Sequence, residues 1–127
     1  MLTPLITSGI SAGFPSPADD HLETGIDLNT ELIQNKAATF FGRVEGDSMK
    51  DAGIDHGDLL VIDKSLEPKN NHIAVCFIDG EFTVKRIRIE KNAILLIAEN
   101  QNYKPITVTT ENDFVIWGIV RHVIKYF

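Results

Sequence analysis

One serine in the sequence has the surroundings of a nucleophile. Ser48 lies in the run Val44-Glu45-Gly46-Asp47-Ser48-Met49, which predicts a strand that ends in a Gly-Asp-Ser turn. In such a turn the hydroxyl is exposed, and the backbone N–H groups of Ser48 and Met49 could stabilise an oxyanion beside it. An ordinary turn serine or a helix cap has the same residue pattern. Ser48 taken alone therefore leaves both the catalytic and the structural interpretation open.

A lysine on an apolar strand face could supply the matching base. Side chains alternate between two faces along the predicted strand Glu81–Ile89, so Lys85 shares its face with Thr83, Ile87 and Ile89. A lysine in this position either extends its amine to water or is buried, and burial lowers its pKa. To accept a proton near neutral pH, its pKa must lie well below the ordinary value of about 10.4.

Histidine and cysteine offer weaker alternatives. His56 or His72 could complete a Ser-His-Asp triad with Ser48, but neither lies beside a segment that would place it there. Cys76 lies within an apolar strand, where a thiol is usually inert and where it fits a reducing compartment, so we expect a cytoplasmic location. The sequence has no Cys-x-x-Cys or His-x-x-x-His spacing, and we expect neither a metal nor another cofactor.

Strands are the elements that must position the serine and the lysine. Segments rich in Val, Ile, Phe and Thr, bounded by Gly, Asn and Asp, predict strands over residues 38–45, 58–63, 72–78, 81–89, 93–98, 106–109 and 114–124. Asp79-Gly80 predicts a tight hairpin between two of them. Asp27 is a plausible N-cap for a short helix over 28–34. We therefore expect a mostly β, antiparallel fold.

The first 25 residues differ in composition from the rest of the chain. They are rich in Pro, Gly, Ser and Thr, which predicts an extended arm without a core of its own. Pro15 and Pro17 disfavour helix at the residues before them, so residues 13–18 should be extended. We therefore divide the chain into an arm over 1–25 and a β-rich domain over 26–127.

Composition and charge exclude several classes of function. A chain of 127 residues that is 43% hydrophobic can build one core. Its net charge of -6, from 18 acidic and 12 basic residues, makes direct nucleic-acid binding unexpected. No apolar stretch reaches the roughly 18 to 20 residues of a membrane helix, and no secretion signal or helix-turn-helix is visible. We expect no membrane association.

The serine and lysine motifs together resemble the Ser-Lys self-cleaving peptidases of the LexA and UmuD group. Ser48 and Lys85 are 37 residues apart (85 − 48), with a strand and a hairpin between them, as in that group. The resemblance covers nearly the whole chain and is carried by residues 12–18, 25–29, 46–49, 57–61, 79–86 and 120–125. Residues 12–18 look like the self-cleavage segment of UmuD.

This resemblance implies a site and a fold. Ser48 would be the nucleophile and Lys85 the general base, with the N–H groups of Ser48 and Met49 as the oxyanion site. The cut would fall between Ala12 and Gly13, where the group commonly has a cysteine before the glycine. Antiparallel twisted sheets with an extended N-terminal arm are the implied fold. LexA-like repressors carry an N-terminal DNA-binding domain, whereas only 12 residues precede this bond, which points to the UmuD subgroup.

The resemblance also implies a role and partners. Proteins of the UmuD type are regulatory subunits of an error-prone translesion DNA polymerase in the SOS response to DNA damage. A homodimer, a UmuC-like polymerase and a RecA–single-stranded DNA filament that triggers cleavage are the implied partners. Two alternatives stay open: a signal-peptidase-like Ser-Lys protease, against which the lack of a membrane anchor counts, and a polymerase-binding subunit that does not cleave itself.

Overall fold

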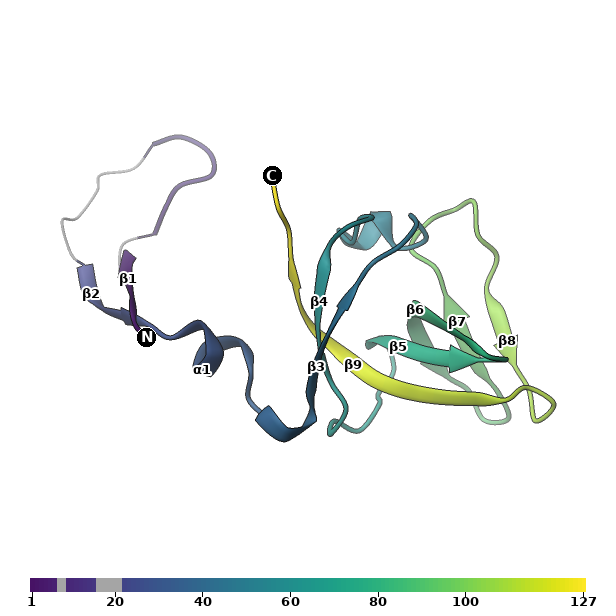
Figure 1. Cartoon of the computed structure of the whole chain (residues 1–127). Coiled ribbons are helices and arrows are strands. Elements are labelled where there is room, and N and C mark those ends of the chain that lie inside the picture. Colours follow the sequence, from purple (N-terminus) through teal and green to yellow (C-terminus); the bar gives the residue numbers. More distant parts are fainter. Residues whose placement is uncertain (7–8, 16–21) are drawn as a thin grey trace. The chain divides into compact units, whose positions relative to one another are not determined.

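The structure is a computed structural model that describes residues 1–6, 9–15 and 22–127; for residues 22–24 it describes the backbone alone. The chain forms two units. Unit 1 comprises Met1–Gln34 and unit 2 comprises Asn35–Phe127 (Figure 1). The arm predicted from the sequence lies wholly within unit 1. The predicted serine and lysine both lie within unit 2.

Unit 1 contains a strand pair that the sequence analysis did not predict. Strand β1 (Thr3–Ile6) pairs antiparallel with β2 (Leu22–Ile26). The two strands are only four and five residues long. They were not predicted because the Pro, Gly and Ser residues between them dominate the composition of this segment. Helix α1 (Leu28–Leu32) follows, and the carboxylate of Asp27 accepts a hydrogen bond from the Asn29 backbone N–H at 3.0 Å. The predicted N-cap is therefore confirmed.

The predicted extended segment at 13–18 is wrong where the structure describes it. Residues 12–14 form a bend, in which the hydroxyl of Ser11 donates to the Phe14 carbonyl and accepts from the Gly13 backbone N–H. This local hydrogen bonding competes with the extended backbone that the prolines favour. Residues 16–18 lie outside the described part of the chain. Residues 9–15 are all exposed.

Unit 2 is an antiparallel sheet of seven strands in the order β3-β4-β9-β5-β6-β7-β8. Its elements are η1 (Lys36–Ala38), β3 (Thr39–Arg43), η2 (Lys50–Ala52), β4 (Leu59–Asp63), β5 (Ile73–Ile78), β6 (Glu81–Ile89), β7 (Ile94–Ile97), β8 (Ile106–Val108) and β9 (Phe114–Ile124). The predicted mostly β, antiparallel fold is confirmed. Both of the longest strands, β6 and β9, have the predicted bounds.

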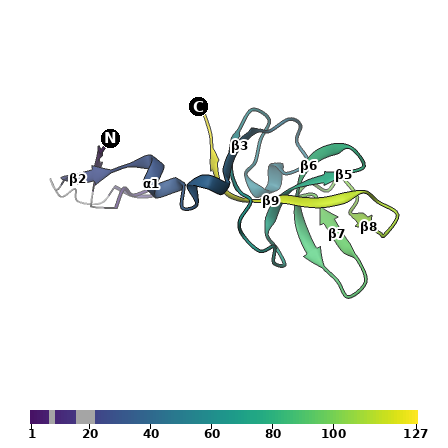
Figure 2. The ribbon, with the colours of Figure 1, turned by 60° about the horizontal axis from the view of Figure 1, so that its bottom comes forward.

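Strand β9 connects the two halves of the sheet. Its C-terminal part pairs with β4 and its N-terminal part with β5, and the register shifts at one point along each pairing. Figure 2 shows β9, in yellow, running through the middle of unit 2. Such shifts increase the local twist of a strand. One long strand can therefore pair with both parts of a strongly twisted sheet.

The hairpin that carries the predicted lysine forms as expected. Asp79 and Gly80 join β5 to β6, and both have a positive φ, 48° and 90°. A two-residue turn with this backbone matches the twist of the strands that it joins, and glycine adopts it without steric cost. The turn sets the register between the two strands, which places Lys85 opposite Ala74.

Two apolar clusters form the core of unit 2. The first comprises Ala74, Cys76, Ile87, Leu96, Val108 and Ile119. The second comprises Val44, Met49, Ile54, Leu60 and Ile62. Met49, the residue after Ser48, is 1% exposed, so the predicted nucleophile turn is fixed by a side chain buried in the second cluster. In the described residues we find no helix long and apolar enough to cross a membrane.

Candidate active site

The turn that bears Ser48 follows strand β3 and precedes η2. Gly46 has a φ of +86°, a left-handed conformation that glycine adopts readily. On either side of the turn, the Val44 carbonyl accepts from the Gly57 N–H at 2.8 Å and the Met49 side chain is buried. The turn is thus fixed at both ends, while Ser48 itself stays half-buried.

Lys85 lies beside Ser48, as the sequence predicted for a reacting pair. The Nζ atom of Lys85 is 3.0 Å from Oγ of Ser48. It also donates to the Thr83 hydroxyl at 2.7 Å and to the Val84 carbonyl at 3.2 Å. A neutral amine has two N–H donors and one lone pair. The two donors can bind Thr83 and Val84, which leaves the lone pair for the proton of the Ser48 hydroxyl.

The surroundings of Lys85 favour its neutral form. The residue is 8% exposed, and it shares its strand face with the fully buried Ile87. Burial lowers the pKa of Lys85, because it removes water from the charged form; the nearby thiol of Cys76 opposes this effect. In the described part of the chain, no carboxylate forms an ion pair with Lys85. The open question of a solvated or a buried lysine is therefore decided in favour of burial.

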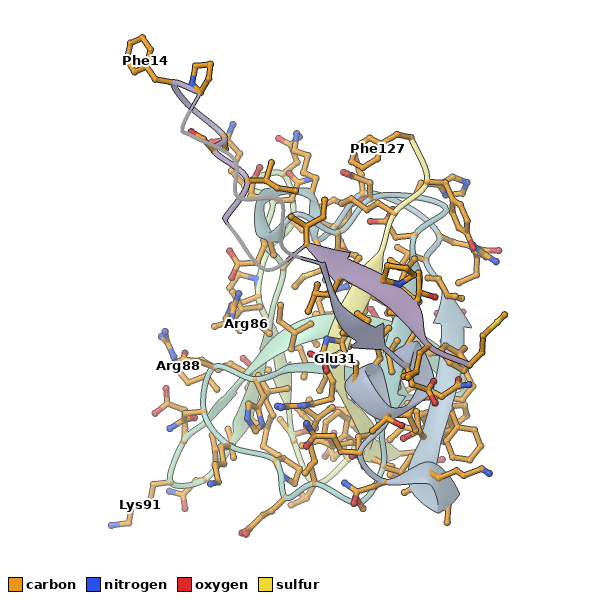
Figure 3. The ribbon with its side chains drawn as sticks, turned by 90° about the vertical axis from the view of Figure 1, so that its left-hand side faces the viewer. Phe14, Glu31, Arg86, Arg88, Lys91 and Phe127 are labelled. Atoms are coloured by element: carbon orange, nitrogen blue, oxygen red, sulfur yellow. The ribbon has the colours of Figure 1, made fainter. Side chains whose placement is uncertain are left out.

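The faces of β6 alternate as the sequence analysis expected. Lys85 and Ile87 are buried on one face, although Ile89 at the end of that face is exposed. On the other face Arg86 is half-buried and Arg88 is exposed (Figure 3). Thr83 shares the face of Lys85 and binds its amine, a contact that the sequence analysis did not assign. The contact could have been inferred from the sequence, because residues two apart in a strand, such as Thr83 and Lys85, lie on the same face.

The two histidines weighed as alternative bases bind backbone amides elsewhere. Nδ1 of His56 accepts from the Gly46 N–H at 3.1 Å, and Nδ1 of His72 accepts from the Lys69 N–H at 3.1 Å. Within residues 22–127 neither imidazole has a hydrogen bond to Ser48. Cys76 is fully buried, and burial raises the pKa of its thiol to about 12. A thiol of this kind is a poor nucleophile.

The backbone N–H groups of Ser48 and Met49 are the ones expected to form the oxyanion site. In the part of the chain that the structure describes, neither the Ser48 N–H nor the Met49 N–H has a protein acceptor. Both belong to the turn that carries the nucleophile. An unpaired N–H beside a serine hydroxyl is the donor that a tetrahedral intermediate requires.

Ser48 opens onto an apolar groove of about 450 Å³. Its walls come from strands β3, β4, β5, β6 and β9, and include the aromatic rings of Phe41, Phe82 and Trp117. The rings of Phe82 and Trp117 meet edge to face, with centroids 5.7 Å apart. Phe41, Gly42 and Arg43 of β3, an edge strand of the sheet, form part of the lining. An edge strand with adjacent apolar pockets suits an extended peptide.

Comparison with known proteins shows the family of this chain. Residues 4–121 match the peptidase S24-like family. The chain belongs to this family. It is 43% identical to protein ImpA of Salmonella typhimurium over 122 residues, which cover 95% of this chain and 82% of ImpA. It is 50% identical to protein SamA of Salmonella typhimurium strain LT2 over 117 residues, 92% of this chain and 81% of SamA.

A third relative of this S24-family chain is a repressor. The LexA repressor of Ectopseudomonas mendocina is 42% identical over 117 residues, which cover 91% of this chain and 57% of the repressor. The high coverage of ImpA and SamA, together with the family match, identifies this chain as a UmuD-like member of the LexA and UmuD group. The resemblance found in the sequence is confirmed.

The burial of Lys85 has a measurable consequence for stability. We expect Lys85→Met to be more stable than the wild type at pH 7, because methionine keeps the apolar face and removes the cost of burying an amine. A lowered pKa in the folded state makes this cost largest below that pKa. The cost then falls by about 1.4 kcal/mol per pH unit and vanishes near pH 10.4, the unfolded value. Denaturant unfolding at pH 7 and pH 10 measures the change.

Lys91→Met is the matched control for this comparison. Lys91 is exposed and projects away from the ribbon (Figure 3). Its replacement should change the free energy of unfolding equally at both pH values. If Lys85→Met also differed from the wild type by the same amount at pH 7 and pH 10, Lys85 would be a solvated lysine.

Proposed function

We propose that this protein is a self-cleaving serine peptidase with Ser48 as nucleophile and Lys85 as general base. The observation that carries this proposal is the 3.0 Å contact between the buried Lys85 amine and the Ser48 hydroxyl. Membership of the S24 peptidase family supports it. The bond that is cut lies between Ala12 and Gly13, and the cut regulates a UmuC-like translesion polymerase in the SOS response.

The first half of the reaction forms an acyl-enzyme. Oγ of Ser48 attacks the carbonyl carbon of Ala12, and neutral Lys85 takes the hydroxyl proton. The N–H groups of Ser48 and Met49 bind the oxyanion. The C–N bond then breaks as Lys85 gives its proton to the amine of Gly13. An ester joins Ala12 to Ser48, and Lys85 is neutral again.

Water completes the reaction. Lys85 takes a proton from a water molecule, whose oxygen attacks the ester carbonyl. Collapse of the second tetrahedral intermediate returns the proton to Oγ of Ser48. The products are a peptide of residues 1–12 and a chain that begins at Gly13. The thermodynamic driving force is peptide-bond hydrolysis itself, and no cofactor takes part.

The arm has the properties of a substrate segment. Ala12 and Gly13 are small and exposed, so backbone can approach the nucleophile closely. Phe14, 94% exposed, and Ile10, 81% exposed, are apolar side chains suited to an apolar groove. Gly13 and Ser48 are 35 residues apart (48 − 13), and a chain of this length can span up to about 115 Å. The length permits cleavage of the same chain or of a second copy in a homodimer.

Cleavage acts as a switch in this proposal. A tethered arm has an effective concentration on the order of millimolar, so a weak groove suffices for it but not for free peptides. The net charge of -6 disfavours nucleic acid as the direct ligand, and contact with DNA is assigned to the RecA filament that triggers the reaction. Loss of residues 1–12 changes the surface to which the polymerase binds. In this proposal the protein acts in the cytoplasm, as a regulatory subunit of that polymerase.

The switch is tested by polymerase binding. We expect the Gly13–Phe127 product and the uncleaved Ser48→Ala protein to differ about tenfold or more in affinity for a UmuC-like polymerase, since only the arm differs. Isothermal titration of both forms against the same polymerase measures this. Full-length Lys85→Ala is the matched control and should bind like Ser48→Ala. Equal affinities of the cleaved and uncleaved forms would leave the cut without a signalling role.

A further inference from the structure

The turn that bears Ser48 is also held by residues 99–103, which link β7 to β8. The Nδ2 atom of Asn100 donates to the Asp47 carbonyl at 3.0 Å, and its Oδ1 accepts from the Asn102 N–H at 3.0 Å. Asn100 is 4% exposed. The Tyr103 hydroxyl donates to the Asp47 carboxylate at 2.7 Å, at the surface. Asn100 thus holds the backbone of the residue that precedes the nucleophile, whereas Tyr103 contacts only the exposed carboxylate of that residue.

We propose that Asn100 is a positioning residue for self-cleavage: its bond to the Asp47 carbonyl fixes the Asp47–Ser48 peptide and so orients the Ser48 N–H toward the oxyanion. This inference rests on the proposed role of Ser48. It assigns to Asn100 no contact with the substrate.

The planarity of the peptide bond transmits the effect. In a trans peptide the C=O and the N–H lie in one plane and point in opposite directions. The Asp47 oxygen is held by Asn100 and, at 3.2 Å, by the Lys50 N–H. The Ser48 N–H therefore points away from Asn100. It has no protein acceptor among the described residues, so it is available as an oxyanion donor.

The position of this peptide needs such a constraint. Gly46 precedes Asp47 with a φ of +86°, and glycine permits many backbone conformations. Rotation of the Asp47–Ser48 peptide would turn the Ser48 N–H away from the oxyanion. It would also leave the buried amide of Asn100 without an acceptor, which costs free energy. The hydrogen bond thus favours one orientation of the peptide.

The same loop connects the nucleophile turn to the strand of the base. The Glu99 N–H donates to Sδ of Met49 at 3.4 Å, and the Glu99 carbonyl accepts from the Asp51 N–H at 2.8 Å. The Glu99 carboxylate forms an ion pair with Arg86, the neighbour of Lys85 on β6. Glu99 is therefore bound both to the turn that bears Ser48 and to strand β6, which bears Lys85. These contacts limit how far the side-chain amide of the next residue, Asn100, can move.

Asn100→Asp is the variant that tests this role. It keeps an oxygen for the Asn102 N–H but replaces the donor to Asp47 with an acceptor. We expect the alkaline plateau of the self-cleavage rate to fall about tenfold to a hundredfold, toward the loss seen when an oxyanion donor is removed. Asn100→Ala, which adds no charge near Lys85, should show a similar fall and leave the pH at half-plateau unchanged, because the contacts of Lys85 are intact. Tyr103→Phe, which leaves the Asp47 carbonyl bond in place, should retain the plateau within about twofold.

Several results would overturn the inference. They are a plateau per folded molecule equal to that of the wild type in Asn100→Asp and Asn100→Ala, with the folded fraction taken from Trp117 fluorescence, or a shifted pH at half-plateau in Asn100→Ala. Asn100→Ala repeats the test without a new charge. Should both variants fail to fold, fast hydrogen exchange of the Asn100 side-chain amide in the wild type would overturn it. A wild-type protein that does not cleave refutes the proposed function itself, whereas a cleaving wild type with unaffected variants refutes this inference alone.

Discussion

Replacing Ser48 with alanine is expected to abolish self-cleavage, and replacing Lys85 with alanine is expected to do the same. Each variant should lose at least about a thousandfold in rate, because residues that act as one catalytic unit fail when either is removed. The 3.0 Å contact between Nζ and Oγ supports treating the two as a unit. Intact-mass measurement of the purified proteins over time gives the rates.

His56→Ala and His72→Ala serve as controls for this prediction. Both imidazoles bind backbone amides through Nδ1, and we expect the variants to retain most of the activity. His56→Ala removes one bond to the turn, at Gly46, and is therefore the more stringent of the two controls. If Lys85→Ala still cleaved itself and one of the histidine variants did not, that histidine would be the general base.

The self-cleavage rate is expected to rise steeply with pH. Only neutral Lys85 can accept the proton of Ser48, so below the folded-state pKa of Lys85 the rate should increase about tenfold per pH unit. Above that pKa the rate should reach a plateau. Because burial lowers the pKa of Lys85, the plateau should begin below pH 10.4, the ordinary value for lysine. A rise of two pH units below the pKa thus corresponds to about a hundredfold.

A pH series of the wild-type protein measures this dependence. The folded fraction at each pH is the required control, since unfolding also lowers the rate. A rate that is flat with pH, in protein that stays folded, would show that proton transfer to Lys85 does not limit the reaction. A midpoint at or above 10.4 would show that the amine is solvated when the site is active.

The strands of unit 2 were predictable because each is a short run of β-forming residues between turn residues. β6 has its predicted bounds since Asp79-Gly80 fixes where it starts and alternation of apolar residues follows it to Ile89. The strand pair in unit 1 escaped prediction, because β1 and β2 are short and lie within a Pro-rich and Gly-rich region. Strand pairing over such a distance in the sequence leaves little local signal.

The pairing of Ser48 with Lys85 was predictable from the sequence, but the contacts around the pair were not. Ser48 and Lys85 each stand in a local motif, whereas Asn100 is 52 residues from Ser48 (100 − 48) and follows a strand in a loop of polar residues. Nothing in its neighbours distinguishes it from Asn102. Only the packing of the loop after β7 against the Ser48 turn places its amide on the Asp47 carbonyl. Contacts of this kind depend on tertiary structure.

The most direct test of self-cleavage by Ser48 and Lys85 is the N-terminal sequence of the fragment that forms when wild-type protein is incubated at alkaline pH, with Ser48→Ala alongside. We expect the wild-type fragment to begin Gly13-Phe14-Pro15 and the variant to give no new terminus. A fragment with another terminus, a fragment from Ser48→Ala, or no wild-type fragment even with a RecA–single-stranded DNA filament would contradict the proposed reaction.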